Sequence, residues 1–166
     1  MPDIVSDSEI SGIITEAKPL FWDWQTQLVN LKDKSDFLEG EFHVVGNNGT
    51  WFRVIVKQHS TYRNNFTIVL AATLHTGIEI RLLRYDGSNN AHLNKIERNR
   101  IRRKAHIHRA TERYQKIGWE FHDGYAKATS RYYDLSGAWE CFWADTNLSN
   151  PIGYHFQTLP NLFTEV

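Results

Sequence analysis

From about residue 37 to residue 85, the apolar residues of this chain change from a helical spacing to an alternating one. Alternation is the period of a β-strand, whose successive side chains point to opposite faces of a sheet. Gly46-Asn47-Asn48-Gly49 adds a hairpin signal, because Asn and Gly tolerate positive φ. The pattern predicts an antiparallel meander of four strands, at residues 37–45, 51–57, 66–74 and 78–85.

Helical spacing flanks this meander on both sides. Ser6-Asp7-Ser8-Glu9 predicts a capping box that starts a helix, and Pro19 should end or kink that helix. The same patterns predict a second short helix at residues 20–31, a charged turn at 32–36, a candidate fifth strand at 105–113 and a C-terminal helix at 136–143. Shorter extended pieces are expected at residues 119–121, 132–135 and 154–156.

These elements predict a single α+β domain spanning residues 1–166, in which N-terminal helices and a C-terminal helix pack on an antiparallel sheet of about five strands. With 166 residues, 41% apolar and 13% aromatic, the chain can build a hydrophobic core, which excludes an intrinsically disordered protein. The expected parts are a helical acidic segment, a β-meander with a basic loop at 95–104, and a C-terminal helix with an irregular tail, at residues 1–36, 37–113 and 114–166.

The net charge of zero hides a segregation of charge along the chain. Residues 1–42 contain nine acidic and three basic residues, a net charge of −6. Residues 95–116 contain nine basic and two acidic residues, a net charge of +7. Such asymmetry indicates either an anion-binding face or one half of the protein docking on the other.

Cys141 is the only cysteine, so the chain has no internal disulfide and no cysteine-based zinc site. This composition predicts a reducing, cytoplasmic location. We find no signal-peptide pattern, and the longest apolar runs are too short for a membrane span, so no membrane partner is expected. The sequence does not indicate an oligomeric state.

A cluster rich in histidine and arginine lies between residues 84 and 109. His106 and His108 are two positions apart, so on a strand they project to the same side. A ribonuclease needs a base for the 2′-hydroxyl and an acid for the leaving oxygen, and histidine suits both roles because its unperturbed pKa is near 6.5. An arginine would stabilise the added charge on the phosphate, and an aspartate would orient a histidine. The candidate catalytic residues are Arg84, Asp86, His92, His106, His108 and Arg109.

The same residues allow a second interpretation, a metal centre with an open position. Three histidines, or two histidines and a carboxylate, make such a catalytic site. Its ligands would be His106 and His108, together with His92 or with Asp86. The leading hypothesis needs no cofactor, and a divalent transition metal is the alternative. A third interpretation makes the two histidines polar residues on a solvated sheet face.

The basic tract at residues 95–104, expected as a solvated loop or a short helix, lies between His92 and His106. Its lysines and arginines would contact phosphates, and exposed aromatic residues nearby would stack on unpaired bases. Aromatic residues follow closely, namely Tyr114, Trp119, Tyr125, Tyr132 and Tyr133. The candidate nucleic-acid-binding residues, with RNA as the preferred partner, are Lys95, Arg98, Arg100, Arg102, Arg103, Lys104, Arg113 and Tyr114. The alternatives are a solvated charge run or a patch that docks on the acidic segment of another copy.

Arg84-Tyr85-Asp86-Gly87, then His92, then a spacer and His106-x-His108 form a pattern that resembles the TumE-like toxin family of bacterial toxin–antitoxin modules. The pattern is also similar to a group of small uncharacterised bacterial and phage-borne proteins. Residues 138–148 resemble the helix that closes the chain in that group. The resemblance covers about residues 50–148 and marks Arg84, Asp86, His92, His106 and His108. This chain departs from the pattern in its basic spacer of thirteen residues and in an extra stretch at 110–131.

The resemblance implies an RNA-directed toxin of a mobile-element or defence system, with an antitoxin as a protein partner. The leading hypothesis is therefore a small intracellular, toxin-like ribonuclease. The alternative is a non-enzymatic inhibitor or accessory protein of a nucleoprotein complex in phage–host defence, which binds through residues 95–104. The sequence contains no Walker loop, dinucleotide fingerprint, nucleophile elbow or zinc-finger spacing that would favour another class.

Overall fold

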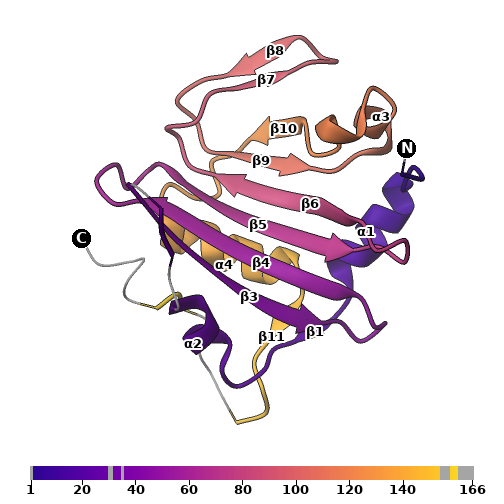
Figure 1. Cartoon of the computed structure of the whole chain (residues 1–166). Coiled ribbons are helices and arrows are strands. Elements are labelled where there is room, and N and C mark those ends of the chain that lie inside the picture. Colours follow the sequence, from indigo (N-terminus) through magenta and orange to yellow (C-terminus); the bar gives the residue numbers. More distant parts are fainter. Residues whose placement is uncertain (1, 30–31, 35, 154–157, 161–166) are drawn as a thin grey trace.

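A computed structural model describes residues 2–29, 32–34, 36–153 and 158–160 (Figure 1). Its main element is an antiparallel sheet of seven strands, two more than the five expected. In spatial order the strands are β10 (Tyr125–Ala128), β9 (His106–Arg109), β6 (Glu79–Asp86), β5 (Phe66–Thr73), β4 (Trp51–His59), β3 (Phe37–Val45) and β2 (Lys32–Lys34). Helices accompany the sheet, so the predicted α+β class is confirmed.

The predicted meander is confirmed as the centre of this sheet, where β3, β4, β5 and β6 pair in sequence order. The first hairpin closes between Val45 and Trp51, and Gly49 in its turn has a φ of 83°, as the turn signal requires. Every second residue of β4 is buried, from Phe52 to Gln58. This burial follows the alternation of the sequence, because one face of the sheet is packed against the core.

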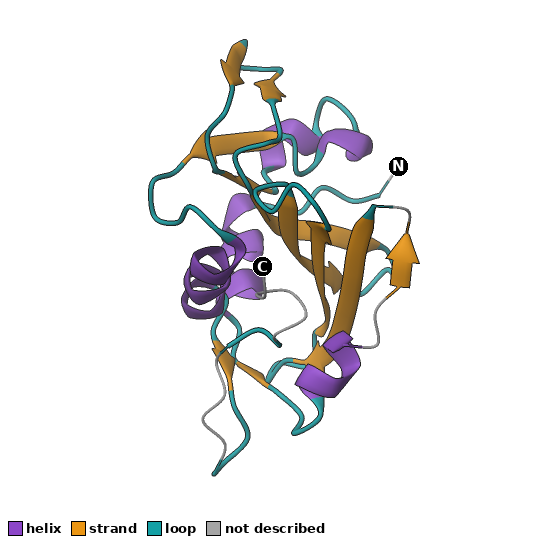
Figure 2. Ribbon diagram, turned by 90° about the vertical axis from the view of Figure 1, so that its left-hand side faces the viewer, coloured by secondary structure: helices purple, strands orange, loops and turns teal. Residues whose placement is uncertain are grey.

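Three longer helices build the other layer. Helix α1 (Asp7–Thr15) begins at the predicted capping box, in which the Ser6 side chain accepts from the Glu9 backbone N–H. Helix α2 (Trp24–Val29) follows, and α4 (Leu135–Asp145) lies against one face of the sheet (Figure 2). The Trp139 ring of α4 stacks on Trp24 and meets the edge of Phe42 from β3, with centroids 5.9 and 6.3 Å apart. These aromatic contacts join both helices to the sheet.

Two sequence predictions at the ends of the sheet are wrong. The charged turn expected at residues 32–36 contains strand β2, which pairs with the start of β3. The strand expected at 105–113 ends at Arg109, because Thr111 caps the short helix α3 (Glu112–Gln115). Local hydrogen bonding decided both cases, since a ladder partner and a helix cap are invisible in the apolar pattern.

The predictions for the C-terminal third were also corrected. The extended piece expected at 119–121 is a 3₁₀ helix, η1 (Trp119–Phe121), and the strand follows it as β10. The extended piece expected at 132–135 leads into α4, whose first turn is capped by the Asp134 side chain. The edge strand expected at residues 154–156 lies outside the described residues.

Two small pairs of strands complete the structure. β1 (Lys18–Pro19) and β11 (Leu148–Ser149) run parallel to each other. β7 (His92–Asn94) and β8 (Asn99–Ile101) form a hairpin that projects at one end of the molecule (Figure 1). The basic tract therefore forms the turn and second strand of a hairpin, in place of the loop or short helix expected. In the part of the chain that is described, no helix has the length and apolar character needed to cross a membrane.

Lys18 is a fully buried lysine that joins the ends of two helices. Its Nζ donates to the main-chain oxygens of Ile14, Glu16 and Thr146 at 2.7, 2.8 and 2.7 Å. These oxygens lie at the C-terminal ends of α1 and α4, where carbonyls lack a partner within the helix and favour a positive charge. Burial lowers the pKa of Lys18 to about 8, although Glu16 opposes the shift.

We expect the free energy of unfolding to rise between about pH 8 and pH 10. The folded-state pKa of Lys18, about 8, is lower than the ordinary value of 10.5, so the unfolded chain holds a proton in this range that the folded chain lacks. The rise should be on the order of 1 kcal/mol per pH unit. Urea denaturation at several pH values measures it, and the Lys18→Met variant should lack this slope. Equal slopes in both proteins would contradict the prediction.

Candidate functional site

The pairing of β6 with β9 assembles the site on the sheet face opposite α4. Arg84 is opposite His108 and Asp86 is opposite His106, so these four residues share one face. Tyr85, between them in sequence, points to the other face, where its ring contacts Phe142 of α4. The predicted common face of the two histidines is therefore confirmed, and β6 adds Arg84 and Asp86 to it.

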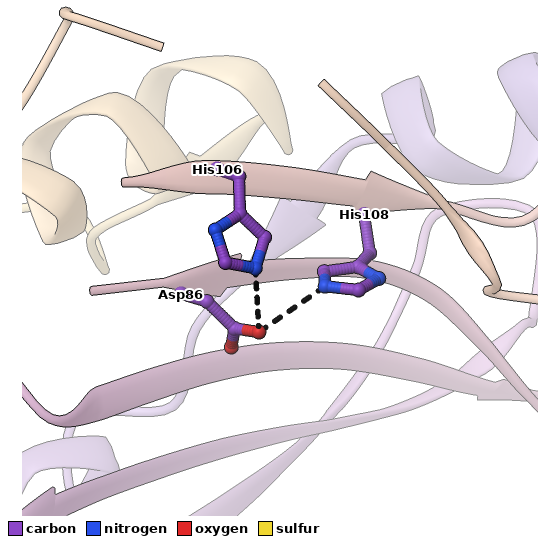
Figure 3. A group of neighbouring side chains, drawn as sticks. All are labelled: Asp86, His106 and His108. Carbon is purple, nitrogen blue, oxygen red and sulfur yellow. Dashed lines mark ion pairs between the residues drawn. The ribbon is translucent and has the colours of Figure 1, made fainter. Parts of the chain in front are cut away.

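The rings of His106 and His108 converge on one carboxylate (Figure 3). Asp86 Oδ2 lies 3.4 Å from His106 Nε2 and 3.2 Å from His108 Nε2. Both histidines are fully buried and Asp86 is 5% exposed, which excludes the solvated sheet face considered from the sequence. The ligand atoms of these three residues all lie within 4.8 Å of one another.

Main-chain oxygens fix the orientation of both rings. Nδ1 of His106 lies 2.9 Å from the oxygen of Lys104, and Nδ1 of His108 lies 3.0 Å from the oxygen of Asp123. A carbonyl oxygen only accepts hydrogen bonds, so we assign the ring proton to Nδ1 in both histidines. At His108 the Arg84 Nη2 atom also lies 3.1 Å from this nitrogen. Each Nε2 faces Asp86. A doubly protonated ring would donate from Nε2 to this carboxylate, whereas a neutral ring would offer a lone pair to a cation bound between them.

Asp86 is an ionised carboxylate held from several sides. Its Oδ1 accepts from the Thr67 hydroxyl at 2.5 Å, and its Oδ2 lies 3.3 Å from Arg84 Nε. Burial raises its pKa, but the contacts with His106 and His108 and the charge of Arg84 outweigh burial, so the pKa is well below its usual range. Asp86 therefore supplies a negative charge at neutral pH.

Arg84 places a positive charge at the centre of the group. Its Nη2 lies 2.9 Å from His108 Nε2, and its Nη1 lies 3.6 Å from Asp123 Oδ2. Asp123 is buried and also pairs with Arg81 at 3.1 Å. Within the described residues, Arg84 Nε, His106 Nε2 and Asp123 Oδ2 are buried polar atoms without a hydrogen bond. The Arg84 guanidinium thus lies beside Asp86 and His108, where it would attract an anionic substrate and repel a bound cation.

His92 reaches the site from the β7–β8 hairpin. Its ring centroid lies 4.4 Å from that of His108 and 6.0 Å from that of His106. Its Nε2 lies 2.7 Å from the oxygen of Gly124 and 3.1 Å from Asn94 Oδ1, so this nitrogen carries the proton. Burial lowers the pKa of His92, and the nearby His108 adds to the effect. Nδ1 is the nitrogen that His92 has left to meet a ligand.

A pocket of about 400 Å³ opens over this group and is lined in part by Thr67, Arg84, Asp86, His92, His106 and His108. The chain leaves the sheet at Gly87, where a Cβ atom would collide with the main-chain oxygen of Asn64. The last position of the Arg84–Gly87 motif therefore needs glycine for a close approach of two backbones. The Arg84–Gly87 motif thus supplies two pocket residues, Arg84 and Asp86, and ends at the glycine where the chain leaves the sheet.

Arg109 does not join the candidate site. It is next to His108 in sequence, so it points to the opposite face of β9. There its Nη2 donates to the Ser11 hydroxyl of α1 at 2.6 Å. The proposed role of Arg109 as a phosphate clamp in this cluster is therefore wrong, and Arg84 is the arginine that the fold brings to the pocket.

The structure separates the predicted nucleic-acid-binding residues into two groups. Tyr114 is fully buried and donates to Glu97 at 2.6 Å, so its ring does not stack on a base. Arg113 pairs with the same carboxylate. The other predicted residues are exposed on or beside the β7–β8 hairpin, namely Lys95, Arg98, Arg100, Arg102, Arg103 and Lys104.

Sequence reasoning missed three residues that support the site. Thr67 lies opposite Asp86 on β5, and Asn94 pairs with the backbone of Ala126 while contacting His92. Asp123 lies in the turn after η1. Its neighbour His122 bonds locally, since its Nδ1 lies 2.7 Å from the Trp119 oxygen. The sequence carries no signal for the bonds of Thr67 to Asp86, of Asn94 to Ala126 and of Asp123 to Arg81, because each joins segments that are distant along the chain.

The Tyr132 hydroxyl fastens the two strands that carry the site. It donates to the main-chain oxygens of Asp86 and His106 at 2.9 and 3.1 Å. Its ring was predicted to stack on a base, yet the ring is buried.

In comparisons with known proteins, no family model matches this chain, and no curated protein or solved structure matches it. The resemblance to the TumE-like toxin family stays a prediction.

Proposed function

We propose that this chain is a metal-dependent ribonuclease in which Asp86, His106 and His108 hold a divalent transition metal ion. The observation that supports it best is the convergence of both Nε2 atoms on Asp86 Oδ2, at 3.4 and 3.2 Å. Two histidines and a carboxylate bind divalent transition metals and leave positions open for water and substrate. The main-chain oxygens at each Nδ1 match the outer hydrogen bonds that orient metal-binding histidines.

A buried lone pair without a partner adds to this support. Buried polar atoms are almost always satisfied by hydrogen bonds. Within the described residues His106 Nε2 has no hydrogen bond, although it faces Asp86. A cation bound between these two atoms would satisfy both, because imidazole and carboxylate each offer a lone pair to it.

The geometry favours ligand roles over a metal-free acid and base for His106 and His108. General acid–base catalysis requires a ring nitrogen within hydrogen-bond reach of a substrate proton. Here each Nδ1 faces a main-chain oxygen and each Nε2 faces Asp86. The rings therefore present no further nitrogen to the pocket, which weakens the leading hypothesis from the sequence.

The remaining pocket residues fit roles around a phosphodiester. A divalent ion would supply Lewis acidity and a bound water of lowered pKa. The Arg84 guanidinium lines the pocket and would bind a non-bridging phosphate oxygen. His92 has Nδ1 available to hydrogen-bond substrate or water, since its Nε2 is held by Gly124. RNA as the substrate is supported by the exposed basic hairpin and by the resemblance to the TumE-like toxin family.

The decisive experiment is RNA cleavage by the purified protein after metal removal. We expect elemental analysis to find about one transition metal ion per chain. EDTA should lower the cleavage rate at least about a hundredfold, and added Mn²⁺ or Zn²⁺ should restore it.

The same assay separates the competing hypotheses. Cleavage that persists in the metal-free protein would contradict the metal centre and would favour histidine acid–base catalysis. No cleavage with any divalent ion would count against an enzyme. The assay uses several RNA substrates, including structured and unstructured ones.

A second candidate function is a non-enzymatic binding module. It is favoured by one observation, the exposure of six basic residues on or beside a hairpin that projects from the sheet. In that case neutralising Arg100, Arg102 and Arg103 should remove activity in cells, whereas variants of His106 and His108 should keep it.

The toxin-like role itself is tested by induced expression in a bacterial host. Growth arrest that requires the histidines would support the ribonuclease.

A further inference from the structure

A cationic groove lies beside the pocket, between the β7–β8 hairpin and strand β10. It has a volume of about 620 Å³, and the residues that matter on its walls are Asn94, Arg100, Arg102, Lys104, Tyr125 and Lys127. The two edges of the groove come from segments that are 20 or more residues apart in the sequence. Lys127 was not among the residues predicted from the basic tract, and β10 brings it there.

The positive charges of this groove are not neutralised. Within the described residues, no ion pair involves Arg100, Arg102, Lys104 or Lys127. Glu97 also lies on the wall, but Arg113 and the Tyr114 hydroxyl hold its carboxylate. The groove therefore has a net positive field that favours a polyanion.

Aromatic rings accompany these charges. Tyr125 lies half-buried on the groove wall, and the Arg113 guanidinium lies over its ring, 5.0 Å from the centroid. A neighbouring hollow of about 560 Å³ contains Arg103, Lys104 and Tyr133, and the Tyr133 side chain is 80% exposed. Both hollows are lined in part by Lys104, so they lie next to each other. Alternating cations and exposed rings are typical of surfaces that bind single-stranded nucleic acid.

Two residues connect the groove to the candidate metal site. Asn94 lies on the groove wall and contacts His92 Nε2 at 3.1 Å. Lys104 lies on the groove wall, while its main-chain oxygen lies 2.9 Å from His106 Nδ1. No residue lines both hollows, so the groove and the pocket are neighbours that Asn94 and Lys104 connect through His92 and His106.

We infer that single-stranded RNA binds along this groove, with phosphates on Arg100, Arg102 and Lys127 and with unpaired bases stacked on Tyr125 and Tyr133. The inference rests on the proposed ribonuclease function, because the groove lies next to the pocket in which a phosphodiester would be cleaved. A single strand is favoured over a duplex, since only unpaired bases expose their faces to tyrosine rings. Single-stranded RNA is also favoured over an acidic protein segment, since an acidic segment has no bases to stack on the tyrosine rings.

The test is fluorescence anisotropy with a labelled single-stranded RNA of about 12 nucleotides. EDTA is present, so that binding is measured without cleavage. Relative to the wild type, the Arg100→Gln/Arg102→Gln/Lys127→Gln variant should bind at least about tenfold more weakly, and its slope of log affinity against log salt should be shallower by about 2. The Tyr125→Leu/Tyr133→Leu variant should lose about tenfold in affinity with the slope unchanged.

The matched control, Lys57→Gln/Lys116→Gln, removes cations outside the groove and should bind RNA like the wild type. Equal affinity in the groove variant and the control would overturn the inference, as would tighter binding of duplex RNA or of polyglutamate than of the single strand. If RNA binding depended on the groove but no metal-loaded protein cleaved RNA, the ribonuclease function would be refuted and the RNA-binding site would remain. If the groove variant cleaved RNA as fast as the wild type, the groove would be refuted as the RNA-binding site and the ribonuclease function would remain.

Discussion

The His106→Ala/His108→Ala variant is expected to hold no transition metal ion and to cleave RNA at least about a thousandfold more slowly than the wild type. Two of three ligands are then missing, and a single carboxylate in water binds such ions weakly. Elemental analysis after gel filtration measures the metal, and single-turnover cleavage at saturating protein measures the rate. The two readouts should fall together.

Folding of this variant is checked separately, because both rings are buried and their Nδ1 atoms bond to Lys104 and Asp123. Asp86→Asn keeps the shape of the third ligand and gives a second variant that tests the same centre. The control is His43→Ala/His75→Ala, which removes two exposed histidines and should change neither readout. Full metal content in a folded His106→Ala/His108→Ala protein would refute the assignment.

The Arg84→Met variant should bind the metal ion at least about tenfold more tightly and yet cleave RNA about a hundredfold more slowly. The tighter binding follows because Arg84 Nε lies 3.3 Å from Asp86 Oδ2 and its charge repels a cation at the same oxygen. The slower cleavage follows because the guanidinium no longer stabilises charge on the phosphate. Isothermal titration calorimetry of the metal-free protein and cleavage at saturating metal measure the two effects.

Opposite signs in the two measurements distinguish this role from a structural one. A merely destabilising change would weaken both metal binding and cleavage. Arg81→Met is the matched control, since Arg81 also pairs with Asp123 but does not line the pocket. Arg81→Met should leave cleavage within a few-fold of the wild type. Weaker metal binding by Arg84→Met would mean that Arg84 supports the ligands and does not compete with the ion.

Prediction from the sequence succeeded where structure is written in a local period. The four strands of the meander and the capped helix α1 follow from alternation and from the capping box, and their observed ends differ from the predicted ones by about two residues at most. The helix expected at residues 136–143 is observed as α4, slightly longer at both ends. Burial of alternate or helically spaced residues fixes these elements, and it depends on near neighbours in the chain.

Prediction failed where a short segment takes its structure from a partner strand and not from an apolar pattern of its own. β2 is charged in sequence and β10 contains only Tyr125–Ala128, so neither has an apolar pattern of its own. Each becomes a strand because the exposed edge of a neighbouring strand offers it hydrogen bonds. Arg109 illustrates the same limit for side chains, since one position along a strand decided which face it joined.

The sequence by itself determined that His106 and His108 share a face and that basic charge lies between His92 and His106. The tertiary structure alone decided that both rings meet Asp86, that Asp123 and Lys104 hold their Nδ1 protons, and that Lys127 joins the basic tract. The spacing of residues along one strand is set by covalent geometry. The meeting of β6 with β9 across a nineteen-residue insertion depends on the register of two strands, which only the packed sheet specifies.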